Sequence, residues 1–463
     1  MSEMPDAERF AEFEAEHNLF LREYKGFPYW QILRYELCRH LFSEQVVVEK
    51  QIYKTTGNSW KIKKQFANLK DGILGHLNCR SIHKADLLMT LDSPRHSVFY
   101  ESWLNDVNVT TCNISYQRMD KCHNMCFEMF LTWFIYHIKK FFHVIKRDKE
   151  EYLFLSDLEL RLKELFGRSL TANEMERIIQ YSTVEDKVFE RYWKKVFNVV
   201  KPKAFVTVCY YTTQRYPAYR EAKKRGIPII EFQHGTIINH TQYLFADTSG
   251  VNNYVPDYLL VFGDNWKKQV KMPKGTKVVS VGYPYQEEEI AKLDSVKMHS
   301  DVVIIYPTPV KEYEEMIKDF AQKASSIGYR VFAKIHPNEA KEVEQNYPVL
   351  SRCSSIEMIT DQSKSVYYWL KYGMHHVVTN STVAIEAVSI DGTNVCVAEE
   401  FPHDTSLPLL ESGVAKSFRD ADELLKIIQD YKCPSNSTQR NLWWMSNGKE
   451  NIIRFFQQQI KVF

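Results

Sequence analysis

Short apolar runs alternate along this chain with longer stretches that follow the helical period. The runs are rich in Val, Ile, Leu and Phe, which is typical of buried strands. They lie at residues 85–91, 107–113, 203–209, 227–232, 258–262, 278–281, 301–306, 329–335, 377–378 and 394–398. Helices between such strands predict parallel sheets that are covered on both faces. The runs form two sets, within residues 80–262 and 300–400, and therefore predict an α/β fold with two Rossmann-like domains.

One of these runs ends abruptly in a polar turn. Residues 227–232 read Ile-Pro-Ile-Ile-Glu-Phe, and Gln233, His234 and Gly235 follow at once. Ligands of open α/β sheets bind beyond the carboxyl ends of the strands. We expect Gly235 to permit a backbone turn that other residues resist. The turn is therefore a candidate site, although an isolated Gln-His-Gly is more simply a tight turn with a surface histidine.

Polar turns also follow three strands of the second set. Their candidate residues are Thr308, Lys334, His336, Asn380, Ser381 and Thr382. Because parallel strands end at a shared edge, these turns should line one crevice. Hydroxyl groups and the free N–H groups of a following helix suit a phosphate, and Glu386, one turn into that helix, is placed to hold ribose hydroxyls. Taken singly, each residue has an ordinary explanation, such as a helix cap for Ser381.

Composition indicates which partners and which cellular compartment to expect for the protein. The formal net charge is +2 and no repeated basic pattern is present, so we expect no nucleic-acid partner. The nine cysteines lack paired spacing, which favours free thiols in a reducing compartment. They also do not form the pattern of a zinc site. The N-terminus is polar and acidic, unlike a secretory signal, and no apolar run is long enough to cross a membrane. We expect a cytoplasmic protein.

Residues 125–147 bear on whether the protein also contacts a membrane surface. The segment combines Phe141 and Phe142 with Lys139 and Lys140. This composition suits a helix that lies on an anionic bilayer, here the inner face of the cytoplasmic membrane. The alternative is a buried amphipathic helix of the first domain, which is slightly favoured because the aromatic residues fall on more than one helical face.

Arg34 lies in an aromatic segment near the start of the chain. The segment opens with Phe27-Pro28-Tyr29-Trp30 and continues with the helical spacing of Trp30, Leu33 and Leu37. A cation in this setting could face an anionic ligand or stack on Trp30. Pairing with an acidic neighbour is the more common outcome.

The order of these motifs resembles that of the bacterial GT-B glycosyltransferases that assemble capsule and lipopolysaccharide. The motifs are Gln233-His234-Gly235-Thr236, Lys334-Ile335-His336-Pro337 and Asn380-Ser381-Thr382 with Glu386. Neighbouring groups that share this pattern are the capsule Kdo transferases, the bacterial polysialyltransferases and the teichoic-acid glycerophosphotransferases. The resemblance covers about residues 200–400, and the aromatic segment with Arg34 resembles the start of many such enzymes. It implies a GT-B fold, in which two Rossmann-like domains face each other across a cleft.

The expected domain limits follow from this comparison. Residues 1–265 would form an acceptor-side domain with helical additions, and residues 266–440 would form the domain that binds the nucleotide sugar. Residues 441–463 would form a terminal helix that crosses back to the first domain, as in many GT-B enzymes.

The resemblance implies transfer of a sugar from a nucleotide-activated donor, linked to UDP or CMP, to a hydroxyl of a growing glycan or lipid-linked glycan. In such enzymes the His-Pro histidine and the Ser/Thr turn hold the nucleotide phosphate, and a carboxylate holds the ribose. Carried over to this chain, these residues are His336, Ser381 and Thr382, with Glu386 on the ribose. Thr308, Lys334 and Asn380, from the same strand-end turns, complete the expected donor-binding set.

A general base would have to come from the first domain. The candidates are Asp92, His234 and Glu231, the last only if its side chain faces the cleft. Residues with an acceptor-side or auxiliary role would be Arg34, Gln233 and Gly235. We expect no metal and no cofactor besides the donor, because the only Asp-x-Asp, at residues 420–422, is better explained as a helix cap.

Three alternatives stay open at this point. A CDP-linked polyol phosphate could be the transferred group, or a sugar-nucleotide epimerase could share the same two-domain shape. A non-enzymatic scaffold that binds glycan is the third. Absence of the acidic-acidic-glycine motif argues against a sialic acid donor, and Gln-His-Gly replaces the Trp-His-Gly that is typical of glycerophosphotransferases.

Overall fold

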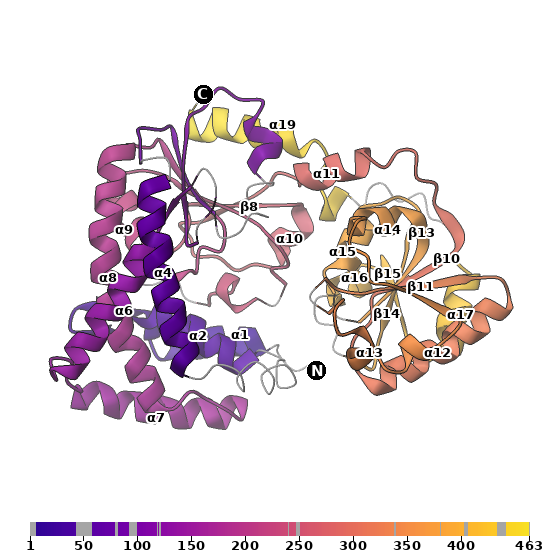
Figure 1. The fold of residues 1–463 in the computed structure, drawn as a ribbon, viewed down its shortest axis with the longest axis horizontal. Helices are drawn as coiled ribbons and strands as arrows, with labels where there is room; N and C mark the ends of the chain where they lie inside the picture. Colours follow the sequence, from indigo (N-terminus) through magenta and orange to yellow (C-terminus); the bar gives the residue numbers. More distant parts are fainter. Residues whose placement is uncertain are drawn as a thin grey trace. The chain divides into compact units, whose positions relative to one another are not determined.

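The computed structural model of the chain describes residues 6–42, 58–78, 82–91, 100–117, 119, 122–238, 240–246, 251–337, 339–379, 381–401, 406–432 and 441–462. The chain divides into two compact units (Figure 1). Unit 1 comprises Met1–Val261, Lys268–Val279 and Glu450–Phe463, and unit 2 comprises Phe262–Lys267 and Ser280–Lys449. Residues 262–267 and 441–449 thus lie with unit 2.

Unit 1 is built on a seven-stranded sheet with the order β5-β4-β3-β6-β7-β8-β9. Its strands are β3 (Leu87–Leu91), β4 (Thr111–Ser115), β5 (His123–Asn124), β6 (Ala204–Thr207), β7 (Ile229–Phe232), β8 (Tyr258–Val261) and β9 (Lys277–Ser280). The pairs from β5 to β8 are parallel. Strand order reverses between β3 and β6, which is where doubly wound sheets open a crevice.

Helices cover this sheet and extend beyond it. They are α1 (Asp6–Glu16), α2 (Trp30–Phe42), α4 (Asn58–Asn78), α6 (Cys126–Phe141), α7 (Lys149–Phe166), α8 (Ala172–Val200) and α9 (Tyr216–Lys224). A small hairpin of β1 (Glu23–Tyr24) and β2 (Phe27–Pro28) lies between α1 and α2. Thr171 begins α8 with a reciprocal capping box to Glu174. Gly226, at φ 68°, follows the end of α9, where a glycine readily adopts the left-handed conformation.

Unit 2 contains a six-stranded parallel sheet with the order β12-β11-β10-β13-β14-β15. The strands are β10 (His299–Ile305), β11 (Arg330–Lys334), β12 (Ile356–Ile359), β13 (Gly373–Val378), β14 (Asn394–Ala398) and β15 (Ala415–Phe418). The helices are α10 (Asp264–Lys268), α11 (Pro284–Ala291), α12 (Lys311–Ser326), α13 (Val343–Asn346), α14 (Val366–Tyr372), α15 (Val383–Val388), α16 (Leu407–Glu411) and α17 (Ala421–Gln429). Here the order reverses between β10 and β13.

The final segment contributes to both units. Trp443 and Trp444 belong to unit 2, where the Trp266 indole N–H donates to the Trp443 carbonyl over 3.0 Å. The chain continues as α19 (Gly448–Phe455) and one π-helical turn (Phe456–Ile460). In unit 1 the Phe456 ring stacks on Trp103, with the ring centroids 4.9 Å apart.

The two doubly wound sheets confirm the predicted α/β class with two Rossmann-like, GT-B-type domains. The predicted strand at 107–113 lies slightly later, at Thr111–Ser115. In the sheet of unit 2, two strands were not expected from the sequence, β12 and β15. Both are edge strands with partly exposed central residues, so they lack the continuous apolar run that marks the buried strands.

Candidate active site

The polar turns of unit 2 meet at the point where the strand order reverses. Thr308 follows β10 and Thr379 follows β13, and the two side-chain hydroxyls are hydrogen-bonded. The buried Ser406 hydroxyl donates to the Thr379 carbonyl over 3.4 Å. This cluster joins neighbouring strands at the position where nucleotides bind in doubly wound folds. Thr379 and Ser406 were not predicted from the sequence, because only the pairing of β10 with β13 brings them to Thr308.

The turn after β13 leads into α15. The Ser381 hydroxyl accepts from the Val383 N–H over 3.3 Å, so it caps the first turn, and Thr382 is exposed. Burial raises the pKa of the Tyr306 phenol, and the nearby charge of Glu386, half-buried on α15, raises it further. The carboxylate is therefore near the end of β10. Since α15 has only six residues, hydroxyl groups would contribute more than the helix dipole to anion binding.

The turn after β11 adds His336 to the same edge. Neighbouring parallel strands are ~4.8 Å apart, so the ends of β11, β10 and β13 span ~10 Å, comparable with a diphosphate and its ribose. His336 is exposed there. Tyr347, which was not predicted, fixes both loops, because its hydroxyl bonds to the Pro307 carbonyl over 3.2 Å and to the Glu339 carboxylate over 2.7 Å.

Lys334 requires a correction. We expected its ammonium group to contact the donor, but the side chain is buried and donates to the Asp361 carbonyl over 3.1 Å and to the Gln362 amide oxygen over 2.8 Å. Burial also lowers its pKa. Lys334 thus anchors the loop after β12 to the end of β11. Asn380, also predicted to bind the donor, lies outside the described residues.

The Gln-His-Gly turn of unit 1 follows β7 as predicted. The Gln233 amide donates to the Gly235 carbonyl over 2.9 Å and so closes the turn. The expectation for Gly235 is wrong, because its φ is not in the left-handed region and an added Cβ would meet nothing within 4 Å. The residue with positive φ at this sheet edge is instead Cys209, at 51°, just after β6. Such strain in a non-glycine residue is often found at functional sites.

Of the two base candidates that the structure describes, His234 is the one that is partly exposed. Its ring is half-buried, and Nε2 lies 3.1 Å from the Cys209 sulfur. Burial raises the pKa of the Cys209 thiol to about 12, so the thiol keeps its proton and can donate it to Nε2. This contact favours the neutral ring with its own proton on Nδ1.

Glu231 cannot act as a direct base. The carboxyl is fully buried, and one oxygen accepts from the Tyr210 N–H over 3.1 Å and from the Tyr243 hydroxyl over 2.8 Å. Burial raises its pKa to about 7. The condition that its side chain faces outward is therefore not met, and Glu231 holds the backbone next to Cys209. Asp92, the third candidate, lies outside the described residues.

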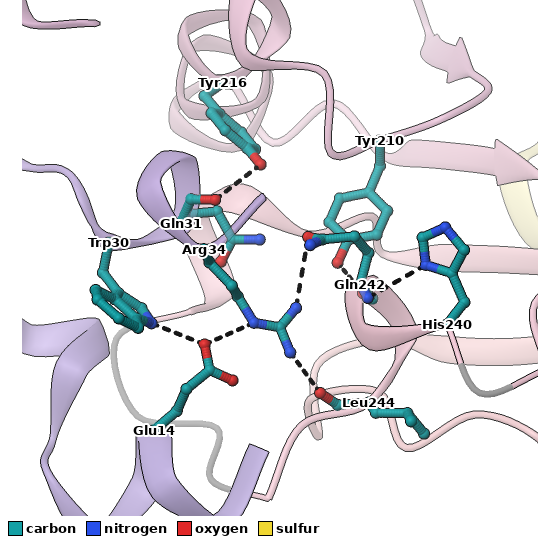
Figure 2. Close-up of polar contacts among 9 residues, drawn as sticks. All are labelled: Glu14, Trp30, Gln31, Arg34, Tyr210, Tyr216, His240, Gln242 and Leu244. Atoms are coloured by element: carbon teal, nitrogen blue, oxygen red, sulfur yellow. Dashed lines mark hydrogen bonds and ion pairs between the residues drawn. The ribbon is translucent and has the colours of Figure 1, made fainter. Parts of the chain in front are cut away.

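Arg34 is part of an internal network and does not face an acceptor (Figure 2). The fully buried guanidinium donates to Glu14 over 2.7 Å and to the Leu244 carbonyl over 2.7 Å. The Trp30 indole donates to the same Glu14 oxygen over 2.8 Å. The alternative of an acidic partner is thus confirmed. The network fastens α1 and α2 to residues 242–244, shortly after the Gln-His-Gly turn.

A pocket of about 330 Å³ opens beside this turn in unit 1. Its walls include Tyr35 and Arg39 of α2, Tyr211 after β6, and His240 and Thr241 after the turn. His240 accepts the Gln242 N–H at Nδ1 over 3.3 Å, and burial lowers its pKa to about 4, so the neutral ring carries its proton on Nε2. We call this the edge pocket. It offers a donor, an acceptor and aromatic surface, which are the groups that bind a sugar.

Among the described residues, no cluster of three or more His, Cys, Asp or Glu is arranged to hold a metal ion. Asp420 caps α17 by accepting the Glu423 N–H over 2.8 Å, as predicted.

No helix within the described part of the chain is long and apolar enough to span a bilayer.

No protein-family model matches the chain. No curated protein matches it either. Among solved structures, the chain is similar to UDP-GlcNAc 2-epimerase from Methanocaldococcus jannaschii (13% identity, TM-score 0.46, covering 80% of this chain and 99% of that one). It is also similar to a ugt transferase from Siraitia grosvenorii in complex with UDP (10%, 0.43, 81% and 99%) and to MurG from Acinetobacter baumannii (11%, 0.42, 80% and 99%). At this level the similarity concerns the fold, which epimerases and transferases share.

Proposed function

We propose that this protein is a glycosyltransferase that moves a sugar from a UDP- or CMP-linked donor to a hydroxyl of a capsule or lipopolysaccharide glycan. The observation that carries the proposal is the cluster of Thr308, Thr379, Ser381 and Glu386 at the β10–β13 reversal of unit 2. Hydroxyl donors suit phosphate oxygens, and a nearby carboxylate suits ribose hydroxyls.

In the proposed reaction, the acceptor hydroxyl replaces the Cys209 thiol as the hydrogen-bond donor to Nε2 of His234 and then gives its proton to that atom. The acceptor oxygen then forms a bond to the anomeric carbon of the donor. The bond from that carbon to the phosphate oxygen breaks, and the nucleotide leaves with the electron pair. Donors from Thr308 and His336 stabilise the charge that develops on the phosphate, which is the contribution expected of preorganised hydrogen-bond donors.

Nucleotide binding is the first expectation to test, by thermal unfolding with UDP, CMP, CDP or GDP. One nucleotide should stabilise unit 2, because a ligand that binds only the folded state adds about 2.7 kcal/mol at 100 times its Kd. Thr308→Val removes a hydroxyl at nearly constant volume and should weaken this binding about tenfold, as expected for a lost hydrogen bond to a charged group. Thr360→Val is the matched control, since Thr360 is exposed after the edge strand β12.

Each outcome has a distinct meaning. Equal nucleotide binding by the wild type and Thr308→Val would show that the donor site does not lie at the β10–β13 edge. Absence of any nucleotide effect would leave the scaffold alternative. The protein is also incubated, without an acceptor, with sugar conjugates of the nucleotide that stabilises it. Epimerisation of the donor sugar under these conditions would contradict a transferase. Selective binding of CDP, with transfer from a CDP-polyol, would replace the sugar by a polyol phosphate.

We further propose that α6 contacts the membrane surface at its carboxyl end. The helix packs against α4 and α8, yet Phe141 and Phe142 are 77% and 68% exposed, beside Lys139 and Lys140. The buried alternative therefore holds for the part of α6 that includes Thr132 and leaves these phenylalanines uncovered. Aromatic residues next to lysines suit the interface of an anionic bilayer.

The double variant Phe141→Ser/Phe142→Ser should bind vesicles of phosphatidylglycerol and phosphatidylcholine at least about tenfold less than the wild type, because each phenylalanine contributes about 1.5–3 kcal/mol when buried. Cosedimentation measures the effect. Leu153→Ser/Leu160→Ser removes two similarly exposed apolar residues from α7 and should leave vesicle binding unchanged. Equal losses in both variants, or none in either, would refute a specific role for α6.

A further inference from the structure

Unit 1 contains a second, larger pocket of about 720 Å³ that shares no lining residue with the edge pocket. Its walls come from α2, α4, α6 and α8 and from the segment after β6. Figure 1 shows α4, α6 and α8 side by side, and α6 packs against both neighbours. We call it the helical pocket. Its volume is in the range of pockets that bind small molecules.

The walls of the helical pocket combine aromatic rings with cations. Trp133, Tyr136 and Tyr181 contribute the rings, and those of Tyr136 and Tyr181 meet edge to face with centroids 5.1 Å apart. Lys64, Lys140 and Arg177 add three exposed cations. They outnumber the carboxylates of Glu36 and the buried Glu185 in the same walls. Aromatic faces pack against the apolar faces of sugar rings, and cations attract phosphate or carboxylate. The combination suits an anionic saccharide.

The inner wall of the pocket connects with the candidate catalytic edge. The buried Glu185 carboxylate accepts from the Thr213 hydroxyl over 3.0 Å and from the Gln214 amide over 2.6 Å. These two residues lie a few positions after Cys209, whose thiol contacts His234. A ligand in the helical pocket would therefore touch the same short segment that supports the proposed base.

The two sides of α6 present different chemistry. The pocket side carries Trp133, Tyr136, His137 and Lys140. A neighbouring side carries the exposed Phe134, Ile138 and Phe141. Each set follows the three- and four-residue spacing of one helical face, and the faces are adjacent because Phe134 directly follows Trp133. A ligand that used both faces would have to be anionic and sugar-like at one end and apolar at the other.

We propose that the helical pocket binds the phosphate-bearing saccharide of a lipid-linked acceptor, whose chain runs over the exposed face of α6. The inference rests on the proposed glycosyltransferase function and names its acceptor class. Lys140 and Arg177 hold the phosphate, and Trp133 and Tyr181 pack against the sugar. The exposed face of α6 would then contact both the membrane surface and the lipid chain of the acceptor, which extends out of the membrane.

Calorimetric titration of the full chain tests this assignment. The probe is farnesyl-diphospho-N-acetylglucosamine below its micellar concentration, compared with N-acetylglucosamine 1-phosphate and with farnesol. The conjugate should bind at least about tenfold more tightly than either fragment. Arg177→Gln and Lys140→Gln should each weaken its binding about tenfold, as expected for a lost charged hydrogen bond. Lys187→Gln, an exposed lysine of α8 outside the pocket, should have no effect.

The outcomes separate this inference from the proposed function. Nucleotide stabilisation should be the same in Arg177→Gln and in the wild type, because Arg177 lies in unit 1. If nucleotides stabilise the protein but the conjugate does not bind, the lipid-linked acceptor is refuted and donor binding stands. Unchanged conjugate binding in Arg177→Gln and Lys140→Gln would place that ligand elsewhere. Equal affinity for N-acetylglucosamine 1-phosphate would overturn the role of the lipid chain.

Discussion

Arg34→Met should lower the free energy of unfolding of unit 1 by about 3–5 kcal/mol, the loss expected when one partner of a buried ion pair is removed. Arg34 and Glu14 have side chains only 0% and 1% exposed, and their contact is 2.7 Å long. The variant leaves the Glu14 carboxylate buried with the Trp30 indole as its remaining donor. It also removes the link from α2 to the Leu244 carbonyl.

The loss should depend on pH. Burial already raises the pKa of Glu14, against the opposing effect of Arg34, and the variant removes that opposing effect. A carboxyl whose pKa is raised in the folded state contributes stability that is fully present below its unfolded pKa and is lost as the pH rises through the folded pKa. The deficit of Arg34→Met should therefore be larger at pH 8 than at pH 5.

Urea unfolding followed by tryptophan fluorescence measures these differences, with the transitions fitted separately because the chain has two units. Arg330→Met is the matched control, since Arg330 and Asp301 form an ion pair whose side chains are 45% and 48% exposed. Its loss should be at most about 1 kcal/mol. The double variant Glu14→Leu/Arg34→Met should recover part of the deficit, because no charge remains buried. A deficit of Arg34→Met no larger than the control's would refute the enclosed ion pair.

Much of the fold could be predicted from the sequence because both sheets are parallel and covered on two faces. Continuous apolar runs such as 301–306 identify the strands in that case, whatever the register. For the same reason, the sequence could not show which way the Glu231 side chain points. In a strand that is buried on both sides, the alternation of residues does not show whether a carboxylate faces a ligand or the interior, and the structure places this one in the interior.

The candidate site could be predicted only in outline. Turn motifs located Thr308, His336 and Ser381 at one sheet edge, since chain order determines which strands end there. The partners of these residues depend on strand order and on packing. Thr379 meets Thr308 because β13 returns beside β10, and Lys334 turns to Gln362 because β12 lies on the other side of β11. Neither contact has a local signal in the sequence.

His234→Asn should reduce kcat by about 10²–10⁴, the usual contribution of a general base, while nucleotide binding to unit 2 stays unchanged. Asparagine is polar and similar in shape at Cγ, but it cannot accept a proton at neutral pH. The reduction should appear in kcat rather than in KM for the donor, since the base acts on the acceptor hydroxyl. Single-turnover transfer from the nucleotide sugar that binds in the thermal test measures it.

Two further variants distinguish proton transfer from structural support. Cys209→Ala removes the thiol that contacts Nε2 at 3.1 Å and leaves the ring in place, so kcat should stay within a few-fold of the wild type. His299→Asn changes a histidine at the amino end of β10, the opposite end from the donor site, and should leave kcat unchanged. If His234→Asn instead raises KM for the acceptor at constant kcat, the histidine binds the acceptor without taking its proton. The base would then have to be sought on another residue at the carboxyl edge of the unit 1 sheet.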